Sequence, residues 1–333
     1  MISDIIVNKI LFIIDEVELK YFEFNKLVTN FWLIAEFLKR EWDVYITTKN
    51  SLYLEADKAK ALCQRTSFDG ELLKEDTLKT YDIESFSAVF FRPDPPVDID
   101  YINATYVLSF VDSEKTFVIN SPQAIRDHNE KLYINNFPEL APDNIVTSNS
   151  NLIRDFLFKK GQIILKPLNR CFGSGVFYLN TQDKNIKTII DTATNSGKTA
   201  IMAQEYLPEI SKGDKRLIFI CGEIYKYCVV KKGSNNDFKF NNHTDENIEA
   251  GVLTKEEEAI QARISKKLLS DGIYMAGLDV IDGKIIEINI TSPCFFIKEI
   301  NEFYNINLEK IIVERLERLI LSASHVNLCN TLQ

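Results

Sequence analysis

This chain of 333 residues contains few histidines and no closely spaced pair of cysteines. The three histidines, His128, His243 and His325, stand far apart in the sequence, and none belongs to a triad-like pattern, so we expect each to be structural or solvated. The six cysteines show no CxxC spacing, which argues against a disulfide framework or a zinc site and favours a reducing compartment. They are Cys63, Cys171, Cys221, Cys228, Cys294 and Cys329.

The sequence also lacks an excess of basic residues and any apolar run long enough to span a membrane. The formal charge is −9 and the pI is about 5.1, which argues against a nucleic-acid partner. The apolar stretch KILFIID (9–15) is too short for a membrane span and has no basic lead-in, so we interpret it as a first β-strand. We therefore expect a soluble, acidic, cytoplasmic protein without nucleic-acid or membrane partners.

Strand and helix patterns alternate along the chain, without internal repeats or low-complexity tracts. Hydrophobic residues make up 45% of the sequence, enough for a large core divided between two or three lobes. The stretches 9–14, 42–48 and 87–94 predict strands, and the helical spacing of apolar residues in 24–42 predicts a helix between them. This order indicates an open α/β lobe that ends near residue 125.

A hairpin at 278–289 (LDVIDGKIIEIN) combines apolar residues with acids. A three-residue loop at 282–284 pairs position 279 with 287 and position 280 with 286. Asp279, Glu287 and Asn289 then share a face, and their oxygen atoms are what Mg²⁺ requires. A solvated sheet face with incidental acids is the alternative interpretation. The opposite, apolar face is formed by Leu278, Val280, Ile286 and Ile288.

Two lysines and a glycine-bearing turn favour the metal interpretation. Lys166 ends the apolar strand QIILKP, and Lys131 follows the start of a predicted helix. Each could be merely solvated. However, the strand leads into a turn in which Gly173 and Gly175 can bring backbone N–H groups close to phosphate oxygens. Together with the acids, these residues indicate a nucleoside-triphosphate site, although the chain has no Walker A motif.

Six segments occur in an order and spacing that are specific to one family. They are FRPDPPVDIDYINATYVL (91–108), INSPQAIRDHNEKLY (119–133), IILKPL (163–168), MAQEYLPEISKGDKR (202–216), GLDVIDGKIIEINITSP (277–293) and IKEI (297–300). With these segments the sequence resembles the bacterial glutathione synthetases of the ATP-grasp superfamily, over nearly the whole chain.

The resemblance implies an α/β fold with α+β lobes: an ATP-grasp fold preceded by an open α/β, or pre-ATP-grasp, domain. The expected domains are residues 1–125 for the N-terminal domain, 126–207 for the central lobe or lid, and 208–333 for the C-terminal lobe with the metal site. ATP is expected between the two antiparallel sheets of the grasp. Mg²⁺, or alternatively Mn²⁺, is expected with it.

The same resemblance implies roles for individual residues. Nucleotide contacts are implied for Lys131, Lys166, Gly173, Gly175, Gln204, Glu205, Tyr206, Leu207 and Asp214. Metal ligation is implied for Asp279, Glu287 and Asn289. Contacts to the other substrates are implied for Arg92, Lys231, Lys239, Asn241 and Ser292. Catalytic roles are implied for Arg216 and Lys166.

The implied chemistry is carboxylate activation. ATP phosphorylates a carboxylate, an amine attacks the acyl phosphate, and an amide, ADP and phosphate are released. The family joins γ-glutamylcysteine and glycine, and such small molecules or their analogues are the expected partners, in a homo-oligomer that is a tetramer or a dimer. Because the protein mainly positions reactants and neutralises charge, it needs no cysteine or serine nucleophile.

Three segments depart from the family pattern. Arg170 and Phe172 replace glycines in the loop after the KPL strand, Lys231 and Lys239 stand where the family has arginine, and Lys298 does so beyond the hairpin. These changes leave two other functions open: a ligase for another carboxylate and amine, or a nucleotide-binding homologue with weak catalysis. The polar stretch 233–250 contains few aliphatic residues and is expected to be a mobile loop.

Overall fold

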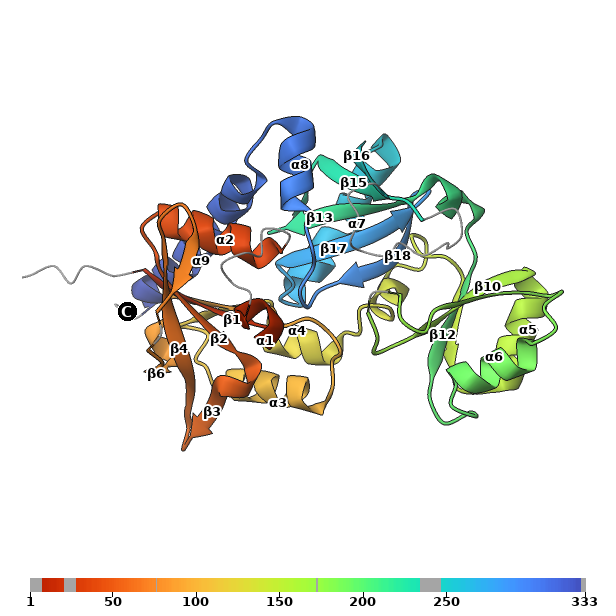
Figure 1. Ribbon diagram of the computed structural model, residues 1–333, viewed down its shortest axis with the longest axis horizontal. Helices are drawn as coiled ribbons and strands as arrows, with labels where there is room; N and C mark the ends of the chain where they lie inside the picture. Colours follow the sequence, from red (N-terminus) through yellow and green to blue (C-terminus); the bar gives the residue numbers. More distant parts are fainter. Residues whose placement is uncertain (1–7, 21–27, 76, 172, 234–246, 331–333) are drawn as a thin grey trace, which may run out of the picture.

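The computed structural model describes residues 8–20, 28–75, 77–171, 173–233 and 247–330. Three β-sheets follow one another along the chain. In space the third sheet (blue) lies between the first (red to orange) and the second (green), as Figure 1 shows. Among the described helices, none is long and apolar enough to cross a membrane.

The first sheet is the predicted open α/β lobe. Its strand order is β3-β4-β2-β1-β7-β8, with β5 and β6 paired to β4, and β1 runs parallel to both β2 and β7. The strands are β1 (Lys9–Ile14), β2 (Asp43–Thr48), β3 (Leu52–Glu55), β4 (Lys58–Phe68), β5 (Leu72–Lys74), β6 (Lys79–Asp82), β7 (Ala88–Phe91) and β8 (Phe117–Ile119). The helices are α1 (Glu16–Lys20), α2 (Thr29–Lys39), α3 (Ile99–Leu108), α4 (Pro122–Asp127) and the 3₁₀ turns η2 (Lys49–Ser51) and η3 (Ile83–Ser85).

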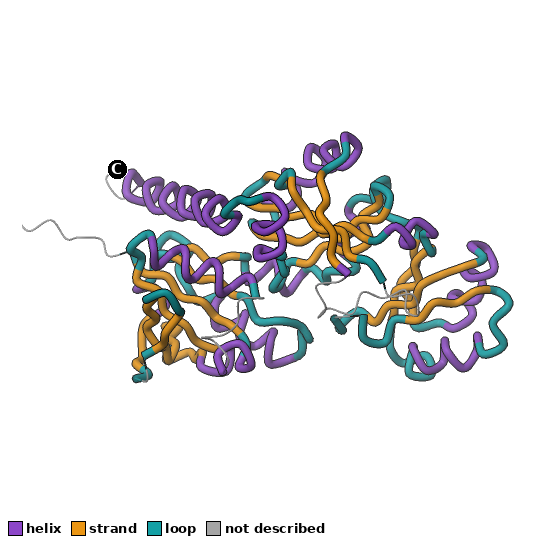
Figure 2. Tube along the Cα trace, turned by 45° about the horizontal axis from the view of Figure 1, so that its top comes forward, coloured by secondary structure: helices purple, strands orange, loops and turns teal. Residues whose placement is uncertain are grey.

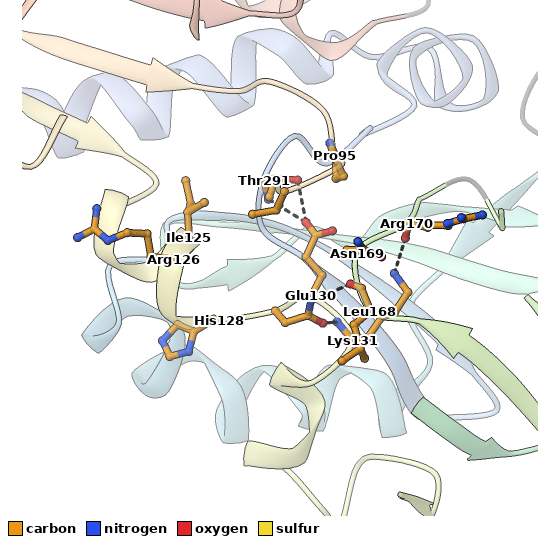
Figure 3. A pocket seen from close by; sticks show the side chains of 12 residues that line it. Pro95, Ile125, Arg126, His128, Glu130, Lys131, Leu168, Asn169, Arg170 and Thr291 are labelled. Carbon is orange, nitrogen blue, oxygen red and sulfur yellow. Dashed lines mark hydrogen bonds between the residues drawn. The ribbon is translucent and has the colours of Figure 1, made fainter. Parts of the chain in front are cut away.

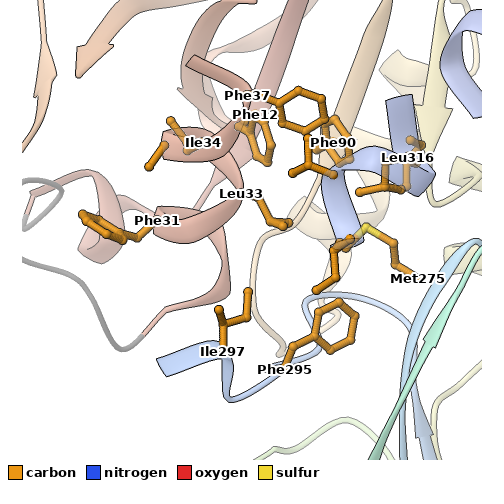
Figure 4. Packing of buried hydrophobic residues seen from close by; sticks show 14 of the residues in the cluster. Phe12, Phe31, Leu33, Ile34, Phe37, Phe90, Met275, Phe295, Ile297 and Leu316 are labelled. Atoms are coloured by element: carbon orange, nitrogen blue, oxygen red, sulfur yellow. The ribbon is translucent and has the colours of Figure 1, made fainter. Parts of the chain in front are cut away.

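Both faces of the first sheet are buried, which explains why β1 is apolar at nearly every position. Leu11 and Ile13 face a core that includes Tyr101 of α3. Phe12 faces the opposite core, where its ring stacks on Phe90 with centroids 4.5 Å apart. Figure 4 shows this second core continuing to residues of the third sheet and of the C-terminal helix.

The second sheet is a small antiparallel sheet with the order β11-β10-β12-β9. Its outer face packs on two helices through its own core, which contains Leu157, Ile163 and Ile190. Its inner face points toward the third sheet and carries Lys166. The elements are β9 (Asn144–Thr147), α5 (Ser150–Lys160), β10 (Gln162–Pro167), β11 (Phe177–Asn180), α6 (Ile186–Ala193) and β12 (Ile201–Glu205).

The third sheet is antiparallel, with the order β16-β15-β13-β17-β18 and with β14 paired to β13. Residues 248–250, which were expected in a mobile loop, form the start of β16; residues 234–246 lie outside the described part of the chain. The strands are β13 (Asp214–Ile220), β14 (Glu223–Ile224), β15 (Tyr227–Lys231), β16 (Ile248–Val252), β17 (Met275–Ile281) and β18 (Lys284–Asn289). The helices are α7 (Lys255–Ser270), α8 (Ile297–Tyr304), α9 (Leu308–Asn330) and the turns η4 (Tyr133–Asn136) and η5 (Pro208–Lys212).

The β17–β18 hairpin confirms one half of the predicted register and corrects the other. Asp279 pairs with Glu287 as predicted, but Val280 pairs with Ile285 and not with Ile286. The turn has two residues, Asp282 and Gly283, both with positive φ, and a bulge on the β18 side then shifts the register by one. Ile285 therefore takes the core position that was expected for Ile286.

The hydrophobic cores do not coincide everywhere with the three domains that were predicted from the sequence. Residues 133–141, which were assigned to the lid, pack in the same core as β17, β18 and α7 of the third sheet. Helix α9, which was assigned to the C-terminal lobe, lies against α2 of the first sheet. Figure 2 shows this long helix beside the N-terminal lobe. The domain division remains a proposal. It is modified by the lid segment that packs with the third sheet and by helix α9, which packs with the N-terminal lobe.

A buried asparagine joins the first sheet to the third. Asn120, directly after β8, is 3% exposed. Its Nδ2 donates to the carbonyl oxygens of Met275 (2.8 Å) and Ile290 (2.7 Å). Its Oδ1 accepts from the backbone N–H groups of Tyr274 (2.8 Å) and Met275 (2.9 Å). One side chain thus satisfies four backbone groups at the junction of β8, β17 and the end of β18.

We predict that Asn120→Ala lowers the free energy of unfolding by about 2–4 kcal/mol, because it leaves buried backbone groups without partners. Urea unfolding, followed by circular dichroism, measures this loss. The matched control is Asn135→Ala, since Asn135 is exposed and donates only to the carbonyl of Leu132. Equal urea midpoints for the two variants would contradict the role given to Asn120.

Candidate active site

Two buried lysines from different parts of the chain reach the same strand. Lys131 donates to the carbonyl oxygen of Arg170 (2.7 Å) and lies 3.2 Å from Oε1 of Glu287 on β18. Lys166, from the inner face of the lid, donates to Oε1 of Gln204 (2.7 Å) and lies 3.4 Å from the carbonyl oxygen of Ile286. The structure therefore brings both predicted phosphate-contacting lysines to the predicted metal-binding strand.

The environment of Lys166 disfavours its positive charge. The side chain is 7% exposed, and burial lowers its pKa to about 8, against an ordinary value of 10.5. The nearby charge of Glu287 partly offsets this effect, and the charge of Lys131 adds to it. An anion such as a phosphate group would stabilise the ammonium that the protein alone stabilises poorly.

A second cluster surrounds the carboxylate of Asp279 on β17. Arg216 donates to both of its oxygens, from Nε (2.8 Å) and Nη2 (3.1 Å), and Lys231 lies 2.8 Å from Oδ1. Lys231 also lies 2.6 Å from Oδ2 of Asp214. Burial favours protonation of Asp279, but the charges of Arg216 and Lys231 outweigh it and hold its pKa below the ordinary value.

These contacts change the predicted metal set. Asp279 also accepts from Nδ2 of Asn289 (3.2 Å), so its two oxygens already receive four hydrogen bonds. It acts here as the partner of two cations, and its expected contact with the metal stays a prediction. In the same way, Asp214 is the ion-pair partner of Lys231, and its expected contact with the nucleotide stays a prediction.

Glu287 and Asn289 fit a cation that arrives with a nucleotide. Nδ2 of Asn289 donates to Gly277 and Asp279, and none of its described hydrogen bonds uses the carbonyl oxygen. No three acid, histidine or cysteine side chains gather within the described ranges as a ready metal cluster. Mg²⁺ commonly takes only one or two ligands from a protein and the rest from phosphates and water, so this donor pair is sufficient.

The glycine turn has the left-handed backbone expected of it, and residues 206–207 connect the lid to the third sheet. Gly173 and Gly175 have φ of 67° and 72°, the left-handed region that glycine adopts without strain. A Cβ at Gly175 would lie 3.1 Å from Cγ of Pro167, so the turn also packs closely. Tyr206 and Leu207 connect β12 of the lid to η5, which leads into the third sheet. Their contact with the nucleotide stays a prediction.

Arg92 and Ser292 lie in a separate group of contacts. Arg92 is 2% exposed and donates to Oδ1 of Asn30 and to the carbonyl oxygen of Pro293, the latter at 3.0 Å. Ser292 hydrogen-bonds to Asp94, which follows β7. The guanidinium of Arg92 thus holds the N-terminal lobe to the loop after β18, and its expected contact with a substrate stays a prediction. Lys239 and Asn241 lie outside the described residues.

A cavity adjoins Lys131, and it contains a residue that the sequence analysis did not select. Glu130 lies at its centre, between Thr291 on one side and the loop of Leu168 and Asn169 on the other (Figure 3). Glu130 stands beside Lys131 in the segment DHNEKL, which was interpreted only for its lysine. The other lining residues are Pro95, Val97, Ile125, Arg126, His128, Asn129, Lys131 and Arg170.

Comparison with solved structures defines the fold. The crystal structure of D-cycloserine synthetase DcsG superposes with a TM-score of 0.69 at 12% identity, covering 94% of this chain and 100% of that one. D-alanyl-alanine synthetase A from Vibrio cholerae gives a TM-score of 0.58 at 11% identity, covering 95% and 99%. At these identities the likeness establishes the fold alone.

Comparison with protein families establishes the class and the family. The model of the prokaryotic glutathione synthetase ATP-grasp domain matches residues 130–305, and that of its N-terminal domain matches residues 9–126. The chain is therefore an ATP-grasp enzyme, an ATP-dependent ligase that forms carbon–nitrogen bonds between small molecules. It belongs to the prokaryotic glutathione synthetase family, whose membership implies the use of ATP with a divalent metal.

Individual relatives agree with this family. The glutathione synthetase of Nostoc sp. (strain PCC 7120) is 36% identical over 288 residues, which span 83% of this chain and 88% of that protein. The glutathione synthetase of Photorhabdus laumondii is 35% identical over 268 residues, which span 80% and 85%. The similarity thus extends across both matched domains.

We predict that affinity for a non-hydrolysable ATP analogue falls as the pH rises above about 8. Free Lys166 loses its proton near pH 8, whereas a bound phosphate favours the charged form, so binding above that pH requires uptake of a proton. The affinity should fall by up to about tenfold per pH unit between pH 8 and 9.5. Isothermal titration calorimetry measures this dependence.

Lys166→Met and Lys166→Arg serve as the matched pair. The methionine variant should bind weakly at pH 7 and show no such slope, while the arginine variant keeps its charge throughout and should also be flat. A wild-type affinity that is independent of pH, or the same slope in the methionine variant, would contradict the assignment.

Proposed function

We propose that this chain is a working glutathione synthetase, which joins γ-glutamylcysteine to glycine with conversion of ATP to ADP and phosphate. The observation that carries the proposal is the convergence of two buried ammonium groups, Lys131 and Lys166, on the strand that bears Glu287 and Asn289. Such an arrangement serves charge neutralisation around a triphosphate. The match of both family domains supports the choice of substrates.

The proposed reaction has two steps. The cysteinyl carboxylate of γ-glutamylcysteine attacks the γ-phosphorus of ATP, which forms an acyl phosphate and releases ADP. The amine of glycine then attacks the acyl carbon, phosphate leaves, and the amine gives up one proton. The products are one amide, one ADP and one phosphate for each ATP.

The buried cations neutralise charge in both steps. Lys131 and Lys166 face the phosphate groups from the two sides of the site, and Gln204 orients Lys166 through their 2.7 Å hydrogen bond. Arg216 is held by Asp279 and by the carbonyl oxygen of Cys294 (3.0 Å), and it is assigned to the acyl phosphate. Because these groups are fixed before substrate binds, they need little reorganisation when negative charge develops.

Mg²⁺ is assigned to Glu287 and Asn289, with Mn²⁺ as a substitute. When bound, the metal offsets the charge of the triphosphate and of the developing transition state. Lys131 lies 3.2 Å from Glu287, so it balances that carboxylate and keeps it in place. The cytoplasmic location, the absence of a nucleic-acid partner and assembly into a tetramer or dimer remain predictions from the sequence and the family.

We predict that incubation with ATP, Mg²⁺, γ-glutamylcysteine and glycine yields glutathione in equal amounts with ADP. Mass spectrometry of the products, with a panel of other amino acids in place of glycine, measures this. A product formed only with another amine would indicate a ligase of different specificity. ADP release without any amide, or no ADP release at all, would contradict the proposed synthesis.

We predict that Glu287→Gln lowers turnover by about 100-fold while the protein stays folded, because the side chain keeps its size but loses the charge assigned to the metal. ADP release at limiting Mg²⁺ measures the loss. The control is Glu302→Gln, on the exposed surface of α8, which should retain the wild-type rate. Near-normal turnover in the Glu287 variant would remove it from the metal site.

A further inference from the structure

Glu130 binds the end of strand β18 through both its backbone and its side chain. Its carbonyl oxygen accepts from the N–H of Ile288 (3.1 Å). Its Oε1 accepts from the N–H groups of Ile290 (2.8 Å) and Thr291 (2.9 Å), and from Oγ1 of Thr291 (2.9 Å). One residue thus receives four hydrogen bonds from a stretch of four residues.

These four bonds fall on either side of Asn289. Side chains alternate along a strand, so Ile288 and Ile290 point into the core while Asn289 points to the opposite face. Fixing the N–H groups of the two isoleucines fixes the direction in which Asn289 presents its carbonyl oxygen. A carboxylate suits this position, because hydrogen bonds to a charged acceptor are stronger than those between neutral groups.

The same segment also positions a cation. Lys131 follows Glu130 directly, and its Nζ lies between the carbonyl oxygen of Arg170 (2.7 Å) and Oε1 of Glu287 (3.2 Å). Figure 3 shows the two side chains leaving the segment in different directions, Glu130 toward Thr291 and Lys131 toward Arg170. The position of Glu130 therefore sets the distance between the Lys131 ammonium and the end of β18.

We propose that Glu130 is a positioning residue, which holds the metal-binding end of β18 in register with Lys131. This inference rests on the metal and nucleotide roles proposed above for Glu287, Asn289 and Lys131. In this arrangement Glu130 itself touches neither the metal nor the nucleotide. It acts through the backbone of residues 288–291.

Keeping a carboxylate at this position has a cost, which its hydrogen bonds oppose. Burial raises the pKa of Glu130, and the negative charge of Glu287 raises it further, while the hydrogen bonds from Thr291 and Ile290 oppose the shift. A buried acid beside another acid destabilises the fold unless its hydrogen bonds compensate. A role in placing the site residues explains why the group stands there.

The test measures metal binding directly, by the electron paramagnetic resonance of Mn²⁺ in the presence of a non-hydrolysable ATP analogue. Glu130→Ala should raise the Kd for Mn²⁺ by about tenfold or more, the size of loss typical when a group that orients a metal ligand is removed. Affinity for the analogue without metal should change by less than about threefold, because Lys131 and Lys166 remain. Glu130→Gln keeps an acceptor oxygen and should restore most of the Mn²⁺ affinity.

Glu309→Gln is the matched control. Glu309, in the first turn of α9, is also a buried acid, 5% exposed, but it accepts from Nδ2 of Asn301 on α8 (2.7 Å) and belongs to neither the nucleotide nor the metal group of residues. It should leave the Kd for Mn²⁺ unchanged. Thr291→Val removes one of the four bonds at constant size and should raise that Kd by a smaller factor than Glu130→Ala.

The outcomes separate this inference from the proposed function. If the wild-type protein and analogue together bind no Mn²⁺, the metal assignment fails, and this inference fails with it. If the wild type binds Mn²⁺ and Glu130→Ala binds it equally well, only the positioning role is overturned. Should Glu130→Ala not fold, Thr291→Val decides: an unchanged Kd for Mn²⁺ overturns the proposal, and a raised one supports it.

Discussion

The ion pair between Asp279 and Arg216 is the contact around which the site is arranged. β17 lies between β13 and β18, so the position of Asp279 has Arg216 as its neighbour on one strand and Glu287 on the other. Burying charged groups costs free energy, and here each oxygen of Asp279 is matched by donors that repay the cost. The pairing places Arg216, which is proposed to meet the acyl phosphate, and Glu287, which is proposed to bind the metal, on the two strands that flank β17 in one sheet.

The bulge at Ile286 sets the register of the same hairpin and also contributes to the contact between two sheets. Without it, a two-residue turn would place Asp279 opposite Ile286 and would put Glu287 on the apolar face. With it, the carboxylates share a face and Ile285 fills the core. The carbonyl oxygen of the bulged residue also lies 3.4 Å from Lys166 of the lid, so the irregularity contributes a polar contact between the two sheets of the grasp.

The sequence predicted those features that depend on residue periodicity and on local motifs. The period of two along 278–289 predicted the pairing of Asp279 with Glu287, but consecutive isoleucines at 285 and 286 fit two registers, and only packing distinguishes them. The partners of Asn120, and the Pro293 carbonyl that accepts from Arg92, lie more than 150 residues away, where no local pattern indicates them. Nothing in the sequence shows that Asp279, which was expected to bind metal, also pairs with two cations.

Helix α9 has a consequence for how the chain is made. One face of the first sheet is covered by Leu308, Ile312, Val313, Leu316 and Ile320 of that helix, although its strands come from the first 119 residues. During synthesis this face, which includes Phe12 and Phe90, stays partly uncovered until residues near 320 have left the ribosome. The N-terminal lobe thus cannot complete its core as an early unit, and in the meantime its apolar face is available to chaperones or to other unfinished chains.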